Sequence, residues 1–255
     1  MVQALIGHTG FVGGNLLRQE AFELRFNSSN IQDIEGRSLD RVVCAGVSAV
    51  KWWANKNPEE DWSRIHALID HLSNLEVGCF TLISTIDVYN PPNNVTEDDR
   101  PDEAALHPYG LHRLRLEDFV RRRFSRCHIV RLPALFGAGL KKNAIFDLIN
   151  DNMMEVINPA SSFQWYPVRR LRADLEIVET SGLSLVNFAA PPLTMGEIHR
   201  RFFPSRAMGA KANAEAHYDM RTKHSDVFGR ADGYILSRDD VFAELAAYLS
   251  AESRA

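Results

Sequence analysis

Two side chains on one expected helix have the chemistry of a proton-transfer site. Tyr109 and Arg113 are four residues apart in the segment Pro108–Arg123, so they lie on the same helix face. A free phenol has a pKa of about 10 and is a poor base at neutral pH, but a neighbouring guanidinium lowers that pKa by stabilising the phenolate. The pair predicts acid–base catalysis by Tyr109; a buried tyrosine that only packs is the alternative.

A glycine-rich segment near the N-terminus has the spacing of a phosphate-binding loop. The apolar run Val2–Ile6 leads into G-H-T-G-F-V-G at 7–13, after which a helix is expected. Gly7 permits the tight turn, Gly10 lets a pyrophosphate approach the backbone, and Gly13 lets the helix pack closely on the strand. A dinucleotide is therefore expected on the helix N-terminus, and a turn without a ligand is the alternative. The residues expected to contact it are Gly7, Thr9, Gly10, Phe11, Val12 and Gly13.

The end of the second expected strand bears on the choice of dinucleotide. NAD-preferring proteins place an acidic residue about 20 residues after the glycines, where it binds the ribose. Here the strand Glu23–Asn27 ends in amides and hydroxyls, of which Asn27 and Ser28 are the candidate contacts. These groups can bind a ribose or leave room for a 2′-phosphate, with Arg25 or Arg37 as its partner. The pattern favours NADP slightly over NAD; an ordinary polar turn is the alternative.

A third group of candidates follows the apolar run Cys79–Ser84, which is typical of a strand. The residues that come next include Thr85 and Asp87. Ligands of open α/β sheets collect at the carboxyl ends of the strands, so both side chains are candidates for contact with a ligand. Threonine also favours strands for purely structural reasons, and that role is the alternative for Thr85.

A parallel sheet covered by helices is needed to bring these groups together. Short, continuously apolar runs alternate with helical segments in the first half of the chain, as in strands buried on both faces. Strands are expected at Val2–Ile6, Glu23–Asn27, Arg41–Ala45, Cys79–Ser84 and His128–Leu132, and helices at Val12–Gln19, Pro58–Leu75 and Pro108–Arg123. In the second half we expect helices at Asn143–Asn150, Thr194–Phe203 and Ser237–Leu249, a strand at Leu183–Phe188, and either a long functional loop or a poorly ordered segment at 204–234.

This order of elements predicts an α/β fold with a doubly wound parallel sheet. We expect residues 1–140 to form the dinucleotide-binding domain, which also receives the strand near 183–189. Residues 141–255 are then mainly a small C-terminal part that binds the substrate.

Composition narrows the classes of protein that fit. The 255 residues carry 29 Lys and Arg against 33 Asp and Glu, a net charge of −4, which disfavours a nucleic-acid-binding protein. No apolar run approaches the ~20 residues of a membrane span. The three cysteines are scattered and form no C-x-x-C pair, which indicates a reducing, cytoplasmic location. The histidines show no metal-binding spacing, so no metal is expected.

Several short motifs, in one order along the chain, point to a known family. They are I-G-H-T-G-F-V-G (6–13), C-A-G (44–46), S-T-I-D-V-Y (84–89), P-Y-G (108–110), R-L-P-A-L-F-G (131–137) and N-F-A (187–189) followed by the helix start at 194–198. Together they resemble the extended short-chain dehydrogenase/reductase family, in particular its nucleotide-sugar epimerases, dehydratases and reductases. The resemblance covers residues 1 to about 200 and implies a Rossmann-like fold.

The resemblance implies roles for individual residues. Tyr109 would be the acid/base on a sugar hydroxyl or carbonyl, and Thr85 would hydrogen-bond the same oxygen. Arg113 would stand where the family has a lysine that holds the nicotinamide ribose and lowers the pKa of the tyrosine. Ala45-Gly46 would lie beside the cofactor and Pro133 beside the nicotinamide ring.

Three residues depart from the family pattern. Arg113 keeps the charge of the family lysine, but its planar head has a different geometry. Ile86 stands where dehydratases carry the first of two acids, which disfavours dehydration and leaves only Asp87. Ala134 replaces an asparagine that contacts the nucleotide sugar in many members, so the identity of the substrate stays open.

Candidates for the substrate site come mainly from the second half of the chain. They are Asp87, Lys142, Asn143, Trp165 and Arg221. Trp165 either stacks on a nucleotide base or is a core aromatic. The basic stretch Arg169–Arg172 is expected to be a solvated turn, and contact with a diphosphate is the alternative.

These expectations converge on an NAD(P)-dependent epimerase or reductase of a nucleotide-linked sugar, which could form a homodimer as many relatives do. A cofactor-binding sensor or scaffold without turnover is the main alternative, because of the changes at Arg113 and Ala134. A non-sugar carbonyl compound is a weaker alternative substrate.

Overall fold

The chain divides into two compact units. The structure is a computed structural model that describes residues 1–253. The first unit comprises Met1–Asn90, Glu97–Leu132 and Arg169–Asn187, and the second comprises Pro91–Thr96, Pro133–Val168 and the residues from Phe188 onward.

A six-stranded parallel sheet forms the centre of the first unit. Its strands are β1 (Gln3–Ile6), β2 (Leu24–Phe26), β3 (Ser38–Cys44), β4 (Glu76–Thr85), β5 (Cys127–Leu132) and β8 (Leu185–Asn187). They lie in the order β2-β1-β3-β4-β5-β8, and every neighbouring pair is parallel. The chain changes direction across the sheet between β1 and β3, which makes their carboxyl ends the switch point where such sheets bind ligands. The strands expected from the sequence are confirmed.

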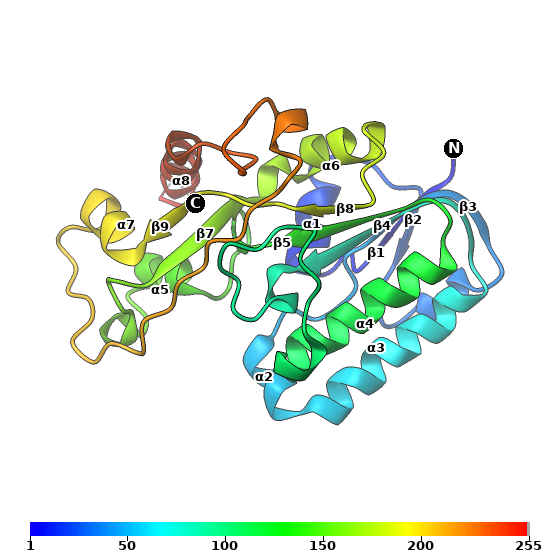
Figure 1. The fold of residues 1–255 in the computed structure, drawn as a ribbon, viewed down its shortest axis with the longest axis horizontal. Coiled ribbons are helices and arrows are strands. Elements are labelled where there is room, and N and C mark those ends of the chain that lie inside the picture. The colour runs from blue at the N-terminus through cyan, green and yellow to red at the C-terminus, as the bar shows by residue number, and fades with distance from the viewer. Residues whose placement is uncertain (254–255) are drawn as a thin grey trace. The chain divides into compact units, whose positions relative to one another are not determined.

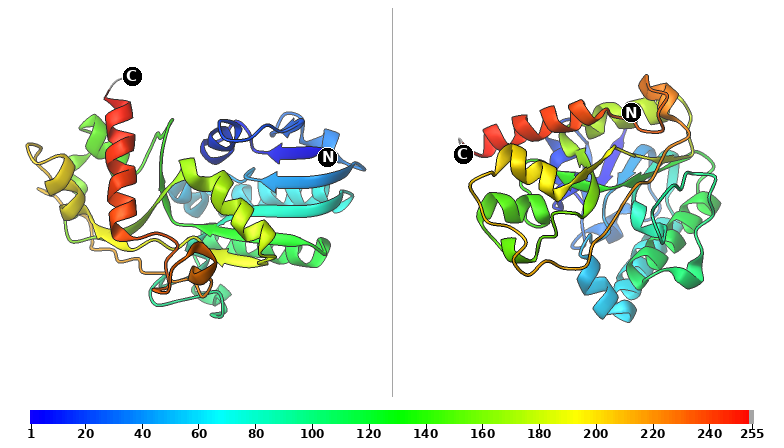
Figure 2. Two further views of the ribbon diagram at one scale, coloured as in Figure 1. Left: turned by 90° about the horizontal axis from the view of Figure 1, so that it is seen from above. Right: turned by 60° about the vertical axis from the view of Figure 1, so that its left-hand side comes forward.

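Helices cover both faces of this sheet (Figure 1). α3 (Pro58–Ser73) and α4 (Pro108–Arg123) run side by side over one face. α1 (Phe11–Leu17) and α6 (Leu171–Thr180) belong to the other face, which Figure 2 shows from above. There Arg41 of β3 donates hydrogen bonds to Glu20, just after α1, and to Glu179 of α6. The doubly wound α/β fold is confirmed.

The core of the first unit follows from the apolar strands and the apolar side of α3. Strand residues such as Val42, Phe80 and Ile129 have no exposed surface, and they pack with the buried Ile65 and Leu72 of α3. α3 and α4 each begin with a proline, whose fixed φ and missing N–H suit the first turn of a helix.

A smaller mixed sheet organises the second unit. Its strands are β6 (Ala134–Phe136), β7 (Ser162–Pro167) and β9 (Pro192–Thr194); β7 pairs parallel with β6 and antiparallel with β9. The helices are α5 (Ala144–Asn150), α7 (Met195–Phe202) and α8 (Arg238–Glu252). A capping box formed by Thr194 and Glu197 begins α7.

Three segments differ from the sequence expectations. The basic stretch Arg169–Arg172 is not a free turn: it leads into α6, whose Leu171, Leu175 and Val178 are buried at helical spacing. The stretch at 163–167, for which the sequence predicted no strand, is part of β7. A short helix that the sequence did not indicate, α2 (Lys51–Lys56), follows β3. Within residues 1–253, no helix has both the length and the apolar character needed to cross a membrane.

Candidate functional site

The glycine loop connects β1 to α1 and lies directly against the end of β3. Gly7 has a φ of +85°, and a Cβ on it would come within 2.3 Å of the Ala45 carbonyl oxygen. A Cβ on Gly13 would come within 2.2 Å of the Gly7 carbonyl oxygen. Both glycines are therefore required by the turn itself. A Cβ on Gly10 would meet only the Gly7 oxygen, at 3.3 Å, so local packing demands this glycine much less.

The first turn of α1 is suited to an anion. Gly10 is the N-cap and has no side chain to accept hydrogen bonds from the first turn, which also contains no acidic residue. The N–H groups at the start of a helix have no partner within the helix and carry its positive dipole end. Thr9, Phe11 and Val12, which were expected to contact a cofactor, belong to this loop and first turn.

The ends of β2 and β3 flank the glycine loop. The Gly7 N–H donates to the Phe26 carbonyl at 2.7 Å, and the Ala45 N–H donates to the Ile6 carbonyl at 2.9 Å. Asn27 follows β2, and its side-chain oxygen accepts hydrogen bonds from the backbone N–H and the hydroxyl of Ser29. The structure therefore brings Asn27 and Ala45-Gly46 to the two sides of the loop, as the parallel order of the strands requires.

Tyr109 and Thr85 meet at the carboxyl end of β4. Tyr109 is in the first turn of α4 and only 7% exposed, and its phenol is hydrogen-bonded with the Thr85 side chain. The Tyr109 backbone N–H donates to the side-chain oxygen of Asn55 in α2, at 3.0 Å. The end of β4 and the start of α4 therefore place Thr85 and Tyr109 together, as their positions in the sequence suggested.

The surroundings of Tyr109 keep its phenol protonated at neutral pH. Burial raises the pKa of Tyr109 above its usual value, and the nearby carboxylate of Asp87 adds to this rise. The positive charges of Arg113 and Lys51 and the hydrogen bond with Thr85 oppose it without cancelling it. In the absence of further positive charge, Tyr109 is therefore a proton donor.

Arg113 lies under the Tyr109 ring but is fully engaged with other groups. Its guanidinium carbon is 3.9 Å from the ring centroid. Its terminal nitrogens donate to both carboxylate oxygens of Asp61, at 2.6 and 3.0 Å, and to the carbonyls of Tyr109 and Ser48. A guanidinium has four terminal N–H donors, so all four are used. The side chain is positioned to influence Tyr109, but it has no terminal donor left for a ribose.

Asp61 holds the Arg113 guanidinium in its place under the Tyr109 ring, and this role was not predicted from the sequence. It is 2% exposed, and besides Arg113 it lies 2.8 Å from His112 Nδ1. Burial by itself would raise the pKa of Asp61, but the hydrogen bonds from Arg113 and His112 outweigh burial and lower it. The available signal was position: Asp61 precedes Ile65 by four residues and so shares the buried face of α3.

Asp87 and Lys51 form a second charge pair beside Tyr109. Lys51 Nζ lies 2.6 Å from Asp87 Oδ1. The Asp87 backbone N–H donates to the Thr85 hydroxyl oxygen at 3.2 Å, so Asp87 and Thr85 are held in one turn. Lys51 is the first residue of α2, a helix that carries no clear apolar repeat, and the sequence offered no signal for this contact.

A buried charged network supports the ends of β4 and β5. Glu117 of α4 accepts hydrogen bonds from Arg131 of β5, at 2.6 and 3.0 Å, and from the Ser84 hydroxyl at 2.5 Å. Arg131 also donates to the Tyr89 phenol oxygen. These interactions fix α4 against the strand that carries Thr85.

Gly110 is what allows α4 to approach the Thr85–Asp87 turn. A Cβ at this position would lie 2.1 Å from the Asp87 carbonyl oxygen. We expect Gly110→Ala to push α4 away from the turn and to destabilise the protein by about 1–3 kcal/mol. Urea unfolding followed by circular dichroism measures this loss. Gly182→Ala is no suitable control because Gly182 has a positive φ, whereas Gly14→Ala adds a Cβ that meets only ordinary contact. Equal stability of the two variants would contradict the prediction.

The remaining candidates from the sequence all belong to the second unit. Asn143 caps α5, with its side-chain oxygen accepting from the Ile145 and Phe146 N–H groups. Trp165 is 1% exposed and contacts Phe163, so its indole is buried among core residues. Arg221 donates to Asp219 and lies over the Tyr234 ring. Burial lowers the pKa of Lys142. Pro133 directly follows β5.

Comparisons with known proteins agree on the fold. No family model and no curated protein matches the chain. Among solved structures, a UDP-N-acetylglucosamine 4-epimerase from Methanobrevibacter ruminantium superposes with a TM-score of 0.76 at 13% identity, covering 97% of this chain and 96% of the other. A dTDP-4-dehydrorhamnose reductase from Clostridium acetobutylicum gives 0.76 at 13% identity, over 99% and 100%. A dTDP-glucose 4,6-dehydratase from Streptomyces venezuelae, solved with NAD, gives 0.74 at 14% identity, over 98% and 96%. The chain therefore has the fold of these nucleotide-sugar enzymes.

Proposed function

We propose that this chain is an NAD(P)-dependent enzyme that transfers hydride to or from a nucleotide-linked sugar. The observation that carries the proposal is the Tyr109–Thr85 pair at the carboxyl end of β4, in the same sheet whose switch point holds the glycine loop. The similar solved structures are an epimerase, a reductase and a dehydratase of nucleotide sugars, and they support this substrate class.

The residues of the first unit fit a dinucleotide. The uncapped first turn of α1 suits the pyrophosphate, and Gly10, which local packing scarcely demands, lets it approach the backbone. Asn27 and Ser28 at the end of β2 would contact the adenosine ribose, and the absence of an acid there favours NADP. When bound, the nicotinamide supplies or accepts the hydride.

The proton chemistry belongs to Tyr109. Because its phenol is protonated at neutral pH, it is suited to donate a proton to the oxygen of a sugar carbonyl as that carbonyl is reduced. Thr85, hydrogen-bonded with the phenol, would orient the same oxygen. Asp87, which is held in one turn with Thr85, would contact the sugar.

The proposal is tested by binding and by turnover. Calorimetric titration with NAD and NADP tests the cofactor, and incubation with a panel of UDP- and dTDP-linked sugars tests the reaction. Absorbance of reduced nicotinamide detects net oxidation or reduction, and chromatography of the sugars detects epimerisation. Failure to bind either dinucleotide would overturn the proposal.

Gly10 provides a sharper test of the cofactor site. We expect Gly10→Ala to weaken dinucleotide binding about tenfold or more, because the added Cβ occupies the path of the pyrophosphate while the fold accommodates it. Gly14→Ala is the matched control: it adds a methyl group to the same helix, where the nearest atom is 3.7 Å away. Isothermal calorimetry on both variants is the measurement, and equal affinities would argue against a pyrophosphate at Gly10.

A cofactor-binding protein without turnover is the second candidate, and the state of Arg113 favours it. With all four terminal N–H groups used, Arg113 cannot donate one of them to a ribose as the family lysine does without giving up a hydrogen bond to Asp61 or to the carbonyl of Tyr109 or Ser48. Tight dinucleotide binding, together with no Tyr109-dependent turnover of any sugar, would select this function instead.

A further inference from the structure

The strongest feature outside the expected motif is the ion pair between Lys51 and Asp87. Lys51 comes from α2, more than fifty residues before Tyr109 in the sequence, yet its ammonium lies 2.6 Å from the carboxylate that follows Thr85. Its side chain is 41% exposed and that of Asp87 22%, so the pair is reached by solvent and is not a buried structural bridge.

The position of α2 relative to Tyr109 is fixed by an independent contact. Asn55, one turn after Lys51, accepts the Tyr109 backbone N–H at 3.0 Å. The loop before α2 also accepts a hydrogen bond from Arg113, at the Ser48 carbonyl. The helix that carries Lys51 is thus attached to the first turn of α4.

The two cations near Tyr109 are paired with different carboxylates. Arg113 is held by both oxygens of Asp61, and its four terminal donors are used. It therefore cannot neutralise Asp87, whose carboxylate would otherwise stand beside Tyr109 with its charge uncompensated. Lys51 is the cation that meets this carboxylate.

We propose that Lys51 is a positioning residue of the Tyr109 site, whose ammonium is anchored there by Asp87 and supplies positive charge to the phenol from outside the helix that carries Arg113. The proposal deepens the proposed function, since it concerns the same acid–base residue. The charged groups facing Tyr109 are Arg113 of α4, itself paired with Asp61 of α3, Asp87 after β4, and Lys51 of α2. Lys51 lowers the pKa of Tyr109 and Asp87 raises it, so loss of Lys51 leaves only the opposing charge of the pair.

The test measures the ionisation of Tyr109 directly, on the full-length protein without cofactor or substrate. Tyrosine labelled with carbon-13 at Cζ reports phenol and phenolate by NMR, and the Tyr109 signal is the one missing from Tyr109→Phe. We expect Lys51→Met to raise the midpoint of Tyr109 by about one pH unit, the lower end of the effect of a neighbouring charge, because solvent screens the pair. Asp87→Asn should lower the midpoint, because it removes the negative charge beside the phenol.

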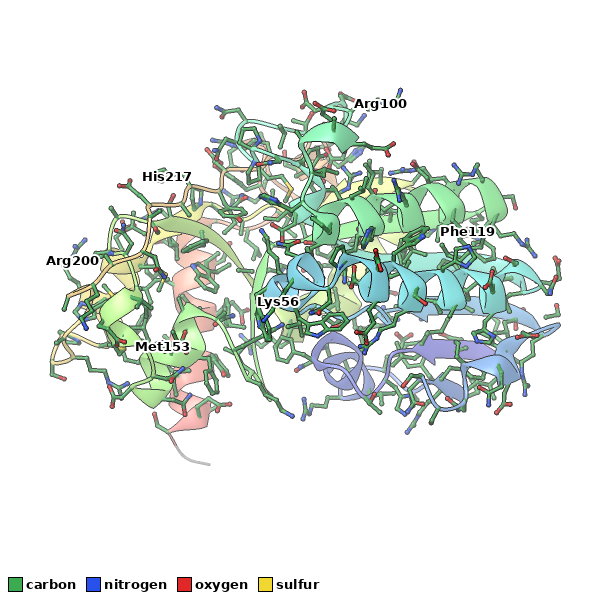
Figure 3. The ribbon with its side chains drawn as sticks, turned by 90° about the horizontal axis from the view of Figure 1, so that it is seen from below. Lys56, Arg100, Phe119, Met153, Arg200 and His217 are labelled. Atoms are coloured by element: carbon green, nitrogen blue, oxygen red, sulfur yellow. The ribbon has the colours of Figure 1, made fainter. Side chains whose placement is uncertain are left out.

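Three further variants separate anchoring from other effects. Lys51→Arg should leave the midpoint at or below the wild-type value, because an arginine keeps its charge over the whole pH range in which a phenol titrates. Lys56→Met removes a lysine from the other end of α2 (Figure 3), where the side chain is exposed, and should change nothing. In the Asp87→Asn background, Lys51→Met should shift the midpoint by less than half as much, because the ammonium is no longer anchored at the site.

Two outcomes would overturn the inference. One is a midpoint in Lys51→Met equal to that in Lys56→Met, and the other is a Lys51→Met shift of the same size with and without Asp87. Since the titration needs no turnover, it is independent of the proposed function: a protein that turns over no sugar yet shows the shifts loses the proposed function and keeps this inference. A protein that turns over a nucleotide sugar but shows no such shifts keeps the proposed function and loses this inference.

Discussion

Tyr109→Phe is expected to lower kcat by about 10²–10⁴-fold on whichever nucleotide sugar the protein turns over, with its affinity for the dinucleotide unchanged. The substitution removes only the phenol oxygen, while the ring that lies over the Arg113 guanidinium stays. Steady-state kinetics and calorimetric titration of the same preparation measure the two quantities.

A matched control distinguishes loss of chemistry from loss of structure. Tyr248→Phe removes a phenol oxygen from α8, where the ring contacts Phe136, and kcat should stay at the wild-type value. The Tyr109 variant should also unfold at nearly the same urea concentration, because its Thr85 partner can still bond to Asp87. Turnover retained within a few fold in Tyr109→Phe would remove Tyr109 from the proton transfer.

The parts of the fold that the sequence predicted well are those with strong local signals. α4 begins at Pro108 and ends at Arg123, as expected, because a proline at its start and three arginines at its end mark the boundaries. The strands are continuous apolar runs that bury both faces, and their parallel order follows from the intervening helices. Once strands and helices were placed, Thr85 and Tyr109 had to meet at one sheet edge.

The charge pairs of the site could not be predicted in the same way, because they join residues far apart in the sequence. Asp61 is one of three acids in the first turn of α3, and it is the buried partner of Arg113, fifty-two residues later. Lys51 is on a helix whose N-cap, Val50, offers no capping side chain, and tertiary contacts such as that of Asn55 hold this helix. Spacing in the sequence identifies which residues share a helix face. It does not identify which charged side chain of another helix or strand forms an ion pair with them.

Trp165 and α6 show that the burial of a side chain is also hard to predict from the sequence. The sequence left Trp165 open between stacking on a nucleotide base and packing in the core, and only the folded chain shows that this residue is 1% exposed. Of the arginines in the stretch 169–172 only Arg172 lies in α6, and the helical spacing of Leu171, Leu175 and Val178 was the better guide to this helix. Charged residues on the exposed side of a short helix do not prevent its other side from being buried.

Asp61→Asn is expected to destabilise the protein by about 3–5 kcal/mol, the largest change in stability that the site offers. The amide is nearly isosteric, but its NH₂ group would face the N–H donors of Arg113, and the buried guanidinium would lose its counter-charge. Asp70→Asn is the control: Asp70 lies on the same α3 and pairs with a histidine, His66, but both side chains are more than half exposed. An exposed pair contributes about 0–1 kcal/mol, and urea unfolding of the two variants measures the difference.

The pH dependence of the free energy of unfolding tests whether the charge of Asp61 causes the stability difference between the wild type and Asp61→Asn. Because its partners hold the pKa of the folded carboxyl below the unfolded value of about 3.9, its contribution is complete above about pH 4 and is lost as the pH falls through the folded pKa. The wild-type protein should therefore lose its advantage over Asp61→Asn as the pH falls below 4. A gap that does not narrow in acid would mean that packing around Asp61, and not its ion pair with Arg113, provides the stability.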